Sequence, residues 1–297
     1  MKSNTYIRVS KVIVKLSHGC ITACELCKDW QAELVDFSRT EIDKIKIHLL
    51  KLFDILDLDF LDAVTFYWGD VINSKYLLEL IEFVNSSTCK KLDYYINCPN
   101  LIPYNKDFLL SLVVLNKKFN IIPVFVRNIK DIKLRENMSD WLKVFTFLQL
   151  YPYLFSPFSI RYYQNEIEKI NEIKIISKKF PEIDFAFWQH PISDYTNKQF
   201  ITEKLWTQDC KYFSYALFDN DVIHFTHPEN EINLMLWGDI TMHTNICYLS
   251  KYRYITNIFQ SEDKIKSDIS IFYSNLESVN KNSISLSHSC YKCIYWY

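Results

Sequence analysis

Glycine is nearly absent from this chain, at only three of its 297 residues. Because glycine serves where the backbone turns tightly or approaches a ligand closely, each of the three marks a position of interest. Gly19 precedes a cysteine-rich segment, Gly69 follows an apolar run, and Gly238 lies between two β-rich runs. We interpret Gly238 as an ordinary turn residue, and expect Gly19 and Gly69 to lie near a site.

The chain also lacks an excess of charge and lacks long hydrophobic runs. Its 34 basic and 35 acidic residues give a formal net charge of −1. This balance gives no electrostatic preference for nucleic acid or for an anionic membrane. No stretch approaches the roughly 20 apolar residues that span a bilayer, and the run Val12-Ile13-Val14 is too short for a signal peptide. We therefore expect a soluble, cytoplasmic protein with neither nucleic acid nor membrane as a partner.

Cysteine, in contrast, is plentiful, with nine residues. Disulfides are rare in a reducing cytoplasm, so metal binding or catalysis is the better interpretation. Three of the cysteines lie near the beginning of the chain, two stand alone, and four lie in its last third. The three sets are Cys20, Cys24 and Cys27; Cys89 and Cys98; and Cys210, Cys247, Cys290 and Cys293.

Strand-like and helix-like segments alternate over residues 1–195, which we expect to form one domain. Strands are predicted at 11–16, 62–68, 92–97, 121–126, 158–163 and 183–188. Helical spacing follows each of the first five, and Thr40 with Asp43 resembles the cap of the first helix. This alternation predicts an α/β fold with parallel strands joined by right-handed crossovers. In parallel barrels the chemistry lies at the C-terminal ends of the strands.

Residues 196–297 change in pattern, and we expect a second, smaller domain there. Two β-hairpins are predicted, 213–218 with 222–226 and 232–237 with 240–244. The rest is polar and rich in serine and asparagine up to a terminal CxxC at Cys290 and Cys293.

Cys20, Cys24 and Cys27 have the spacing CxxxCxxC and directly follow the first predicted strand. Three thiolates can hold three irons of a [4Fe-4S] cluster and leave the fourth iron open. The motif resembles the signature of the radical S-adenosylmethionine (radical SAM) enzymes, although Leu26 stands where that family usually has an aromatic residue. The resemblance implies that the open iron binds SAM and that SAM is cleaved to a 5'-deoxyadenosyl radical. It also implies a partial (β/α)6 parallel barrel.

The same resemblance implies cofactor contacts at the strand ends. Trp68-Gly69-Asp70 is similar to the family's Gly-Gly-Glu, in which backbone and carboxylate hold the SAM amino group. Gly69 and Asp70 can provide such an acceptor for an ammonium group at close range. The alternative is a strand that simply ends in a turn. The segment 96–101 resembles the family's Thr-Asn-Gly turn in a degraded form.

Three further side chains are candidates for cofactor binding. Arg161 and Arg127 follow or lie on predicted strands, where a cation can hold the SAM carboxylate or ribose. For both arginines an ordinary ion pair is the alternative. His190, after the sixth strand, is a candidate base or adenine contact, although lone histidines are more often structural.

Cys210, Cys247, Cys290 and Cys293 are four ligands, the number that closes one iron–sulfur cluster. Their arrangement resembles the auxiliary-cluster domains, SPASM and twitch, of radical SAM enzymes. The small number of cysteines favours a one-cluster, twitch-like domain, which we expect to hold one auxiliary [4Fe-4S] cluster. A tetrahedral zinc site is the alternative. Of the two remaining cysteines, Cys98 is a candidate hydrogen-atom donor to a substrate radical, with a small buried hydrophobe as the alternative.

The resemblance implies an enzyme, most often one that modifies a ribosomally made peptide or protein side chain by crosslinking, epimerisation or oxidation. The expected partners are a peptide and an electron donor such as flavodoxin or ferredoxin. The chain begins close to its first strand, so we expect leader binding to need a separate protein or none. Two alternatives remain: a radical SAM enzyme for a small molecule such as a sugar, nucleoside or cofactor precursor, and a non-catalytic Fe–S or zinc protein.

Overall fold

The structure is a computed structural model that describes residues 6–16, 37–67, 70–155, 157–162, 166–189, 215–219, 222–226, 231–235, 237–242 and 254–281. The chain divides into two compact units. Unit 1 comprises Met1–Val14, Asp43–Asp62 and Pro191–Tyr297, and unit 2 comprises Lys15–Ile42 and Ala63–His190. The domain boundary expected between residues 195 and 196 stays a prediction.

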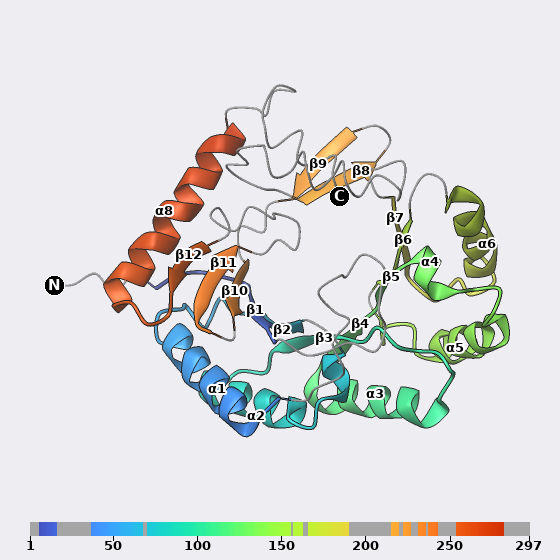
Figure 1. Cartoon of the computed structure of the whole chain (residues 1–297), viewed down its shortest axis with the longest axis horizontal. Helices are drawn as coiled ribbons and strands as arrows, with labels where there is room; N and C mark the ends of the chain where they lie inside the picture. The colour runs from blue at the N-terminus through green and yellow to red at the C-terminus, as the bar shows by residue number, and fades with distance from the viewer. Residues whose placement is uncertain are drawn as a thin grey trace. The chain divides into compact units, whose positions relative to one another are not determined.

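Unit 2 alternates strands with helices (Figure 1). Its strands are β2 (Ala63–Tyr67), β3 (Asp93–Asn97), β4 (Ile121–Val124), β5 (Val126–Asn128), β6 (Phe158–Tyr162) and β7 (Phe185–Gln189). Between them lie the short η2 (Val71–Asn73) and the helices α2 (Leu77–Thr88), α3 (Lys106–Phe119), α4 (Ile129–Ile132), α5 (Met138–Leu150) and α6 (Ile167–Ser177). Each predicted strand and helix of this region is present, so the predicted alternation is confirmed.

All strand pairs of unit 2 are parallel and neighbours in space are neighbours in sequence, in the orders β2-β3-β4 and β5-β6-β7. A single residue, Phe125, separates β4 from β5. Its carbonyl accepts the Ser159 N–H at 3.0 Å, while the Val124 carbonyl accepts the Cys98 N–H at 3.0 Å. An order without reversal is that of a singly wound barrel wall, whereas a doubly wound sheet reverses at a switch point. The α/β class is confirmed, and its strand order is that of a partial barrel.

Local chemistry explains the helix ends. Asn105 caps α3, because its Oδ1 accepts the Phe108 N–H at 3.1 Å. The helix ends at Asn120, which adopts a left-handed φ of 53°. The long helix α1 (Arg39–Phe53) begins with a capping box in which Ser38 N donates to the Glu41 carboxylate at 2.7 Å. The cap is therefore Ser38 with Glu41, and the predicted pair Thr40 and Asp43 is wrong.

Unit 1 contains β1 (Lys11–Lys15), whose last residue belongs to unit 2, and an antiparallel addition from the C-terminal part of the chain. The strands β10 (Glu231–Met235), β11 (Asp239–Met242) and β12 (Tyr254–Asn257) lie beside β1 in the order β12-β11-β10-β1. A separate hairpin pairs β8 (Tyr215–Asp219) with β9 (Val222–Thr226). Both predicted hairpins are confirmed, since β10 and β11 are also antiparallel neighbours.

Gly238 is required at the turn between β10 and β11. Its φ is +96°, and an added Cβ would lie 2.9 Å from side-chain atoms of both Ile258 and Phe259. A larger residue would therefore strain the backbone and collide with its neighbours.

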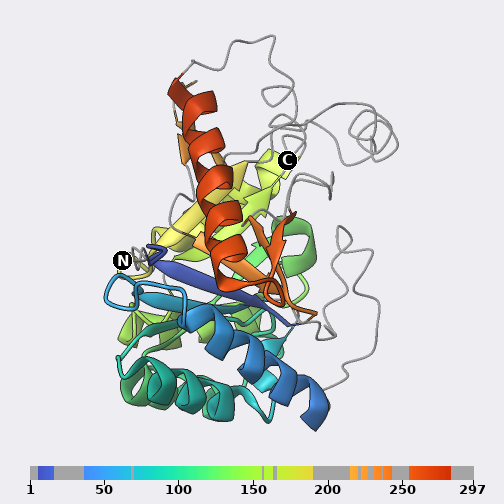
Figure 2. The same ribbon diagram turned by 90° about the vertical axis from the view of Figure 1, so that its left-hand side faces the viewer.

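The polar C-terminal stretch also holds two elements that its composition did not predict. They are β12 and the helix α8 (Glu262–Lys281), which contacts β12 (Figure 2). The helix buries Ile265 and Ile269, which are four residues apart on one side. None of the helices in the described ranges is both long and apolar enough to cross a membrane.

Candidate active site

The strands of unit 2 present two chemically different faces. The helix face consists of strand side chains that pack against the helices, such as Tyr94, whose hydroxyl donates to Asn85 Oδ1 on α2 at 2.7 Å. On β6, Phe158 stacks on Phe125 and meets Phe145 of α5, with ring centroids 4.1 and 5.6 Å apart. Figure 1 shows α2, α3, α5 and α6 along this side of the strands. The helix face is therefore a packed core.

The polar face is the other side of the same strands. Residues that pair across parallel strands share a face, because side chains alternate along each strand. The register pairs Thr65 with Tyr95, and Asn128 with Arg161. The polar members of this face include Thr65, Tyr95, Asn97, Asn128, Ser159 and Arg161, and the same register adds the apolar residues Ile122, Val124 and Val126. Several are only partly buried, as the alternating burial of β3 shows. Parallel strands are usually apolar on both faces, so these polar groups indicate a ligand-binding surface.

Asp70 lies just beyond the C-terminal end of β2 and precedes η2. It is fully buried, and its Oδ2 accepts Asn73 Nδ2 at 2.9 Å and Asn100 Nδ2 at 3.2 Å. Its Oδ1 is also buried but has no hydrogen-bond partner among the described residues. Because an unpaired buried carboxylate oxygen is costly, this atom is suited to accept a hydrogen bond from a bound cation. That geometry fits the ammonium acceptor that the resemblance implies.

Cys98 follows β3 and lies close enough to Asp70 for the two to interact electrostatically. The thiol is fully buried, and this burial, together with the negative charge of Asp70, raises its pKa well above the ordinary value. Cys98 is therefore a neutral thiol, the form that can donate a hydrogen atom. Continued alternation, however, places it on the same side as Tyr94 and Ile96, which belongs to the helix face. Its role as a donor stays a prediction.

The structure places the two candidate arginines on opposite faces. Arg161 pairs with Asn128 on the polar face and is half-buried. Arg127 pairs with Ile160 on the helix face, and only 9% of it is exposed. Its Nη1 donates to the Pro99 carbonyl at 3.1 Å, and its Nη2 to the Asp131 carbonyl at 3.4 Å. Arg161 thus shares a face with the polar groups, whereas Arg127 does not.

All seven of the predicted metal ligands lie outside the described residues. The same is true of two predicted cofactor contacts. These positions are Cys20, Cys24, Cys27, Cys210, Cys247, Cys290, Cys293, Gly69 and His190. The described part of the chain contains no group of three or more histidine, cysteine or acidic side chains that could hold a metal ion. Both metal sites therefore stay predictions.

Sequence reasoning missed the two amides that hold Asp70 in place. Asn73 lies three residues after Asp70, a spacing typical of one tight turn, and this signal was available. Asn100 belongs to the turn after β3, and nothing in the sequence pairs it with a residue 30 positions away. Only the parallel pairing of β2 with β3 brings those two strand ends together.

Comparison with known proteins gives distant structural similarities. No protein-family model matches the sequence, and no curated protein matches it. The chain is similar to BtrN in an open conformation, with 12% identity, a TM-score of 0.40, and coverage of 97% of this chain and 99% of that one. It is also similar to anSMEcpe with bound AdoMet and the Kp18Cys peptide, with 12% identity, a TM-score of 0.48, and coverage of 88% and 82%. Similarities of this size carry no argument about the reaction.

Proposed function

We propose that the chain is a radical SAM enzyme whose open cluster is held by Cys20, Cys24 and Cys27. The observation that carries the proposal is the buried carboxylate of Asp70, one oxygen of which has no hydrogen-bond partner among the described residues. This position follows the strand end at which the family resemblance expects an acceptor for the SAM ammonium group. A cysteine motif without such an acceptor would fit a simple iron–sulfur protein equally well.

Four residues of the chain are proposed to contact the cofactor, each in a different way. Asp70 accepts a hydrogen bond from the ammonium group, and the backbone at Gly69 lets the ligand approach closely. Arg161, on the polar face, pairs with the carboxylate or the ribose. His190 contacts the adenine or acts as a base. When bound, the cluster and SAM supply a 5'-deoxyadenosyl radical that abstracts hydrogen from the substrate.

The proposed substrate is a peptide or a protein side chain. The support is the polar face, where the partly exposed side chains of Tyr95 and Asn97 carry a hydroxyl and an amide group. These groups both donate and accept hydrogen bonds, as a peptide backbone does. Cys210, Cys247, Cys290 and Cys293 are proposed to hold one auxiliary cluster. Such a cluster would supply an acceptor for the surplus electron if the product is oxidised.

The test is metal and SAM analysis of the full-length chain after anaerobic reconstitution. Replacing Cys20, Cys24 and Cys27 together with alanine is expected to remove about four irons per chain and to abolish formation of 5'-deoxyadenosine. Cys89→Ala is the matched control, because Cys89 is exposed and belongs to neither set. Unchanged iron content in the triple variant would overturn the proposal.

The same preparations show whether the set of Cys210, Cys247, Cys290 and Cys293 binds iron or zinc. If they hold a cluster, the triple variant retains about four irons, and Cys290→Ala with Cys293→Ala removes them. Zinc in place of iron at this stage would show a closed structural site and contradict the auxiliary cluster. That outcome would not affect the assignment of the open cluster to Cys20, Cys24 and Cys27.

A further inference from the structure

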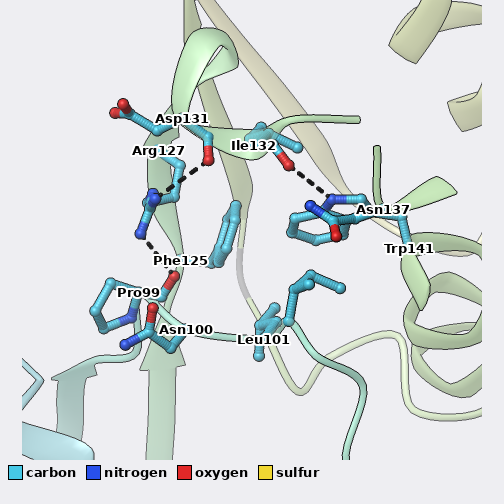
Figure 3. A pocket seen from close by; sticks show the side chains of 10 residues that line it. Pro99, Asn100, Leu101, Phe125, Arg127, Asp131, Ile132, Asn137 and Trp141 are labelled. Carbon is cyan, nitrogen blue, oxygen red and sulfur yellow. Dashed lines mark hydrogen bonds between the residues drawn. The ribbon is translucent and has the colours of Figure 1, made fainter. Parts of the chain in front are cut away.

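A small pocket of unit 2 includes Arg127, which belongs to the helix face (Figure 3). It is formed by the turn after β3, by Phe125 and Arg127, and by the segment from α4 to α5. Its volume is about 150 Å³, below the roughly 300–1,000 Å³ of sites for drug-sized ligands. The lining residues used below are Leu101, Phe125, Arg127, Ile132 and Trp141. Asn100, whose Nδ2 donates to Asp70, also lines the pocket. Room therefore exists for one small chemical group.

Arg127 places a buried positive charge at this pocket. Both of its described hydrogen bonds go to neutral backbone carbonyls, those of Pro99 and Asp131. No carboxylate of the described residues pairs with it. The Asp131 carboxylate instead accepts Asn128 Nδ2 at 3.4 Å, and Figure 3 shows it pointing away from the guanidinium. A buried cation without a counter-charge is unfavourable, so the site is electrostatically incomplete.

The guanidinium also has donors to spare. An arginine carries five N–H donors, and the buried Nε of Arg127 has no partner among the described residues. A carboxylate accepts two parallel hydrogen bonds from such a group. The neighbouring walls of Leu101, Phe125 and Trp141 are apolar, which suits a short hydrocarbon body attached to that carboxylate.

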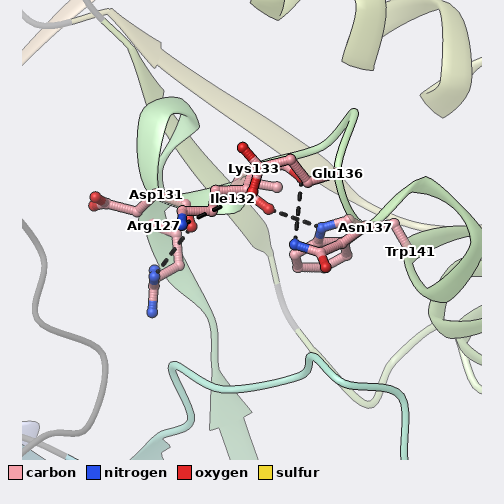
Figure 4. Close-up of polar contacts among 7 residues, drawn as sticks. All are labelled: Arg127, Asp131, Ile132, Lys133, Glu136, Asn137 and Trp141. Carbon is pink, nitrogen blue, oxygen red and sulfur yellow. Dashed lines mark hydrogen bonds and ion pairs between the residues drawn. The ribbon is translucent and has the colours of Figure 1, made fainter.

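The pocket is held in shape by hydrogen bonds that do not involve a ligand (Figure 4). Trp141 Nε1 donates to the Ile132 carbonyl at 3.0 Å, and Asn137 Nδ2 donates to the Lys133 carbonyl at 3.4 Å. The segment between α4 and α5 is thereby tied to the start of α5. A pre-formed site loses little conformational entropy when it binds a ligand.

We propose that this pocket binds a small carboxylate with a short apolar body, and that Arg127 is its specificity-determining residue. The inference is independent of the proposed radical chemistry, because it needs neither a cluster nor SAM. It also separates Arg127 from Arg161, since the two arginines face opposite sides of the sheet.

The test compares propionate with propionamide, its neutral isostere, by ligand-observed NMR on the full-length wild-type chain. The dissociation constant of propionate is expected to be at least about tenfold lower, the difference that one charge-assisted hydrogen bond supplies. Saturating SAM is expected to leave propionate binding unchanged. Equal binding of the two compounds, no binding of either, or displacement of propionate by SAM would each overturn the inference.

Two variants assign the effect to a residue. Arg127→Met is expected to make the two compounds bind equally, and Arg127→Lys to restore only part of the preference because lysine lacks the planar fork. Arg135→Met is the matched control, since Arg135 is an exposed arginine that pairs with Glu172. If Arg127→Met does not fold, the wild-type comparison of propionate with propionamide still decides. An equal loss of preference in Arg135→Met would contradict the assignment.

Discussion

The two faces of the parallel strands in unit 2 share one backbone but have opposite chemistry. On the helix face, Tyr94, Ile96, Phe125 and Phe158 are at most 1% exposed and pack against one another and the helices. On the polar face, Tyr95, Asn97 and Arg161 carry hydroxyl, amide and guanidinium groups and are partly accessible. The packed core lies on the first face, and the second face is the proposed ligand surface. A substitution should therefore affect folding or binding according to the face on which it falls.

Arg127 and Asp70 sharpen this contrast, because each is a buried charge with one atom that lacks a hydrogen-bond partner in the described part of the chain. Arg127 interrupts the helix face, and Asp70 lies beyond the end of β2. Neither buried atom contributes favourably to the free energy of folding, because burial of an unpaired polar atom is unfavourable. Both are explained more simply by ligands of opposite charge.

The largest effect is expected for Phe158→Ala. The ring lies among Phe125, Trp141, Phe145, Phe155 and Phe185, all with centroids within 6.1 Å. Removing it should lower the free energy of unfolding by about 3–5 kcal/mol, because a cavity remains in a close-packed core. Urea denaturation measures this loss. Ser159→Ala, on the polar face of the same strand, should cost no more than about 1 kcal/mol; equal losses would erase the distinction between the faces.

Asp70→Asn should act on ligand binding instead. The amide keeps the shape of the side chain and removes its negative charge, so the affinity for SAM should fall about tenfold to a hundredfold, the worth of one hydrogen bond to a charged group. Calorimetric titration of SAM measures the affinity. The free energy of unfolding should not decrease greatly, since a buried charge is removed. Asp107→Asn, at an exposed position on α3, is the control. An unchanged affinity would remove Asp70 from the site.

Arg161→Gln tests the polar face within a strand. Arg161 is half-buried, so water screens its charge in part, and we expect SAM affinity to fall by about threefold to tenfold. Thermal unfolding should change little. Arg135→Gln, which removes an exposed charge elsewhere, should alter neither quantity. A large loss of stability without a loss of affinity would assign Arg161 to structure.

Many of the helices and strands of unit 2 can be predicted from the local spacing of apolar residues. Strands such as 92–97 and helices such as the one at 107–115 were predicted from apolar spacing, because a parallel sheet must bury its helix face. The pattern does not reveal which polar residue faces which side, since that depends on register across strands far apart in sequence. Arg127 and Arg161 are indistinguishable as isolated residues, and only pairing with Ile160 and Asn128 separates them.

The C-terminal helix shows a second limit of sequence reasoning. The stretch from 262 to 281 is polar overall, and its apolar residues are sparse enough to resemble a loop. It is nevertheless helical, because Ile265 and Ile269 recur at helical spacing and find a partner surface in unit 1. The overall composition of the segment hides two apolar residues among many polar ones, whereas their spacing of four residues reveals them.

The smallest effect is expected for the alkylation of Cys98. This reaction tests whether a reagent in solution reaches a thiol on the helix face. Folding raises the pKa of this thiol, through burial and the charge of Asp70, so the native protein keeps it protonated at a pH where an ordinary thiol ionises. Because only the thiolate reacts, labelling by iodoacetamide should stay negligible from about pH 7 to pH 9. The exposed Cys89 should be labelled in the same sample, as peptide mass spectrometry can show for each cysteine separately.

In urea both should react, with rates that rise through the ordinary thiol pKa. Rapid native labelling of Cys98 would mean that it is accessible and partly ionised, and the separation between a sealed face and a reactive face would then fail at the end of β3.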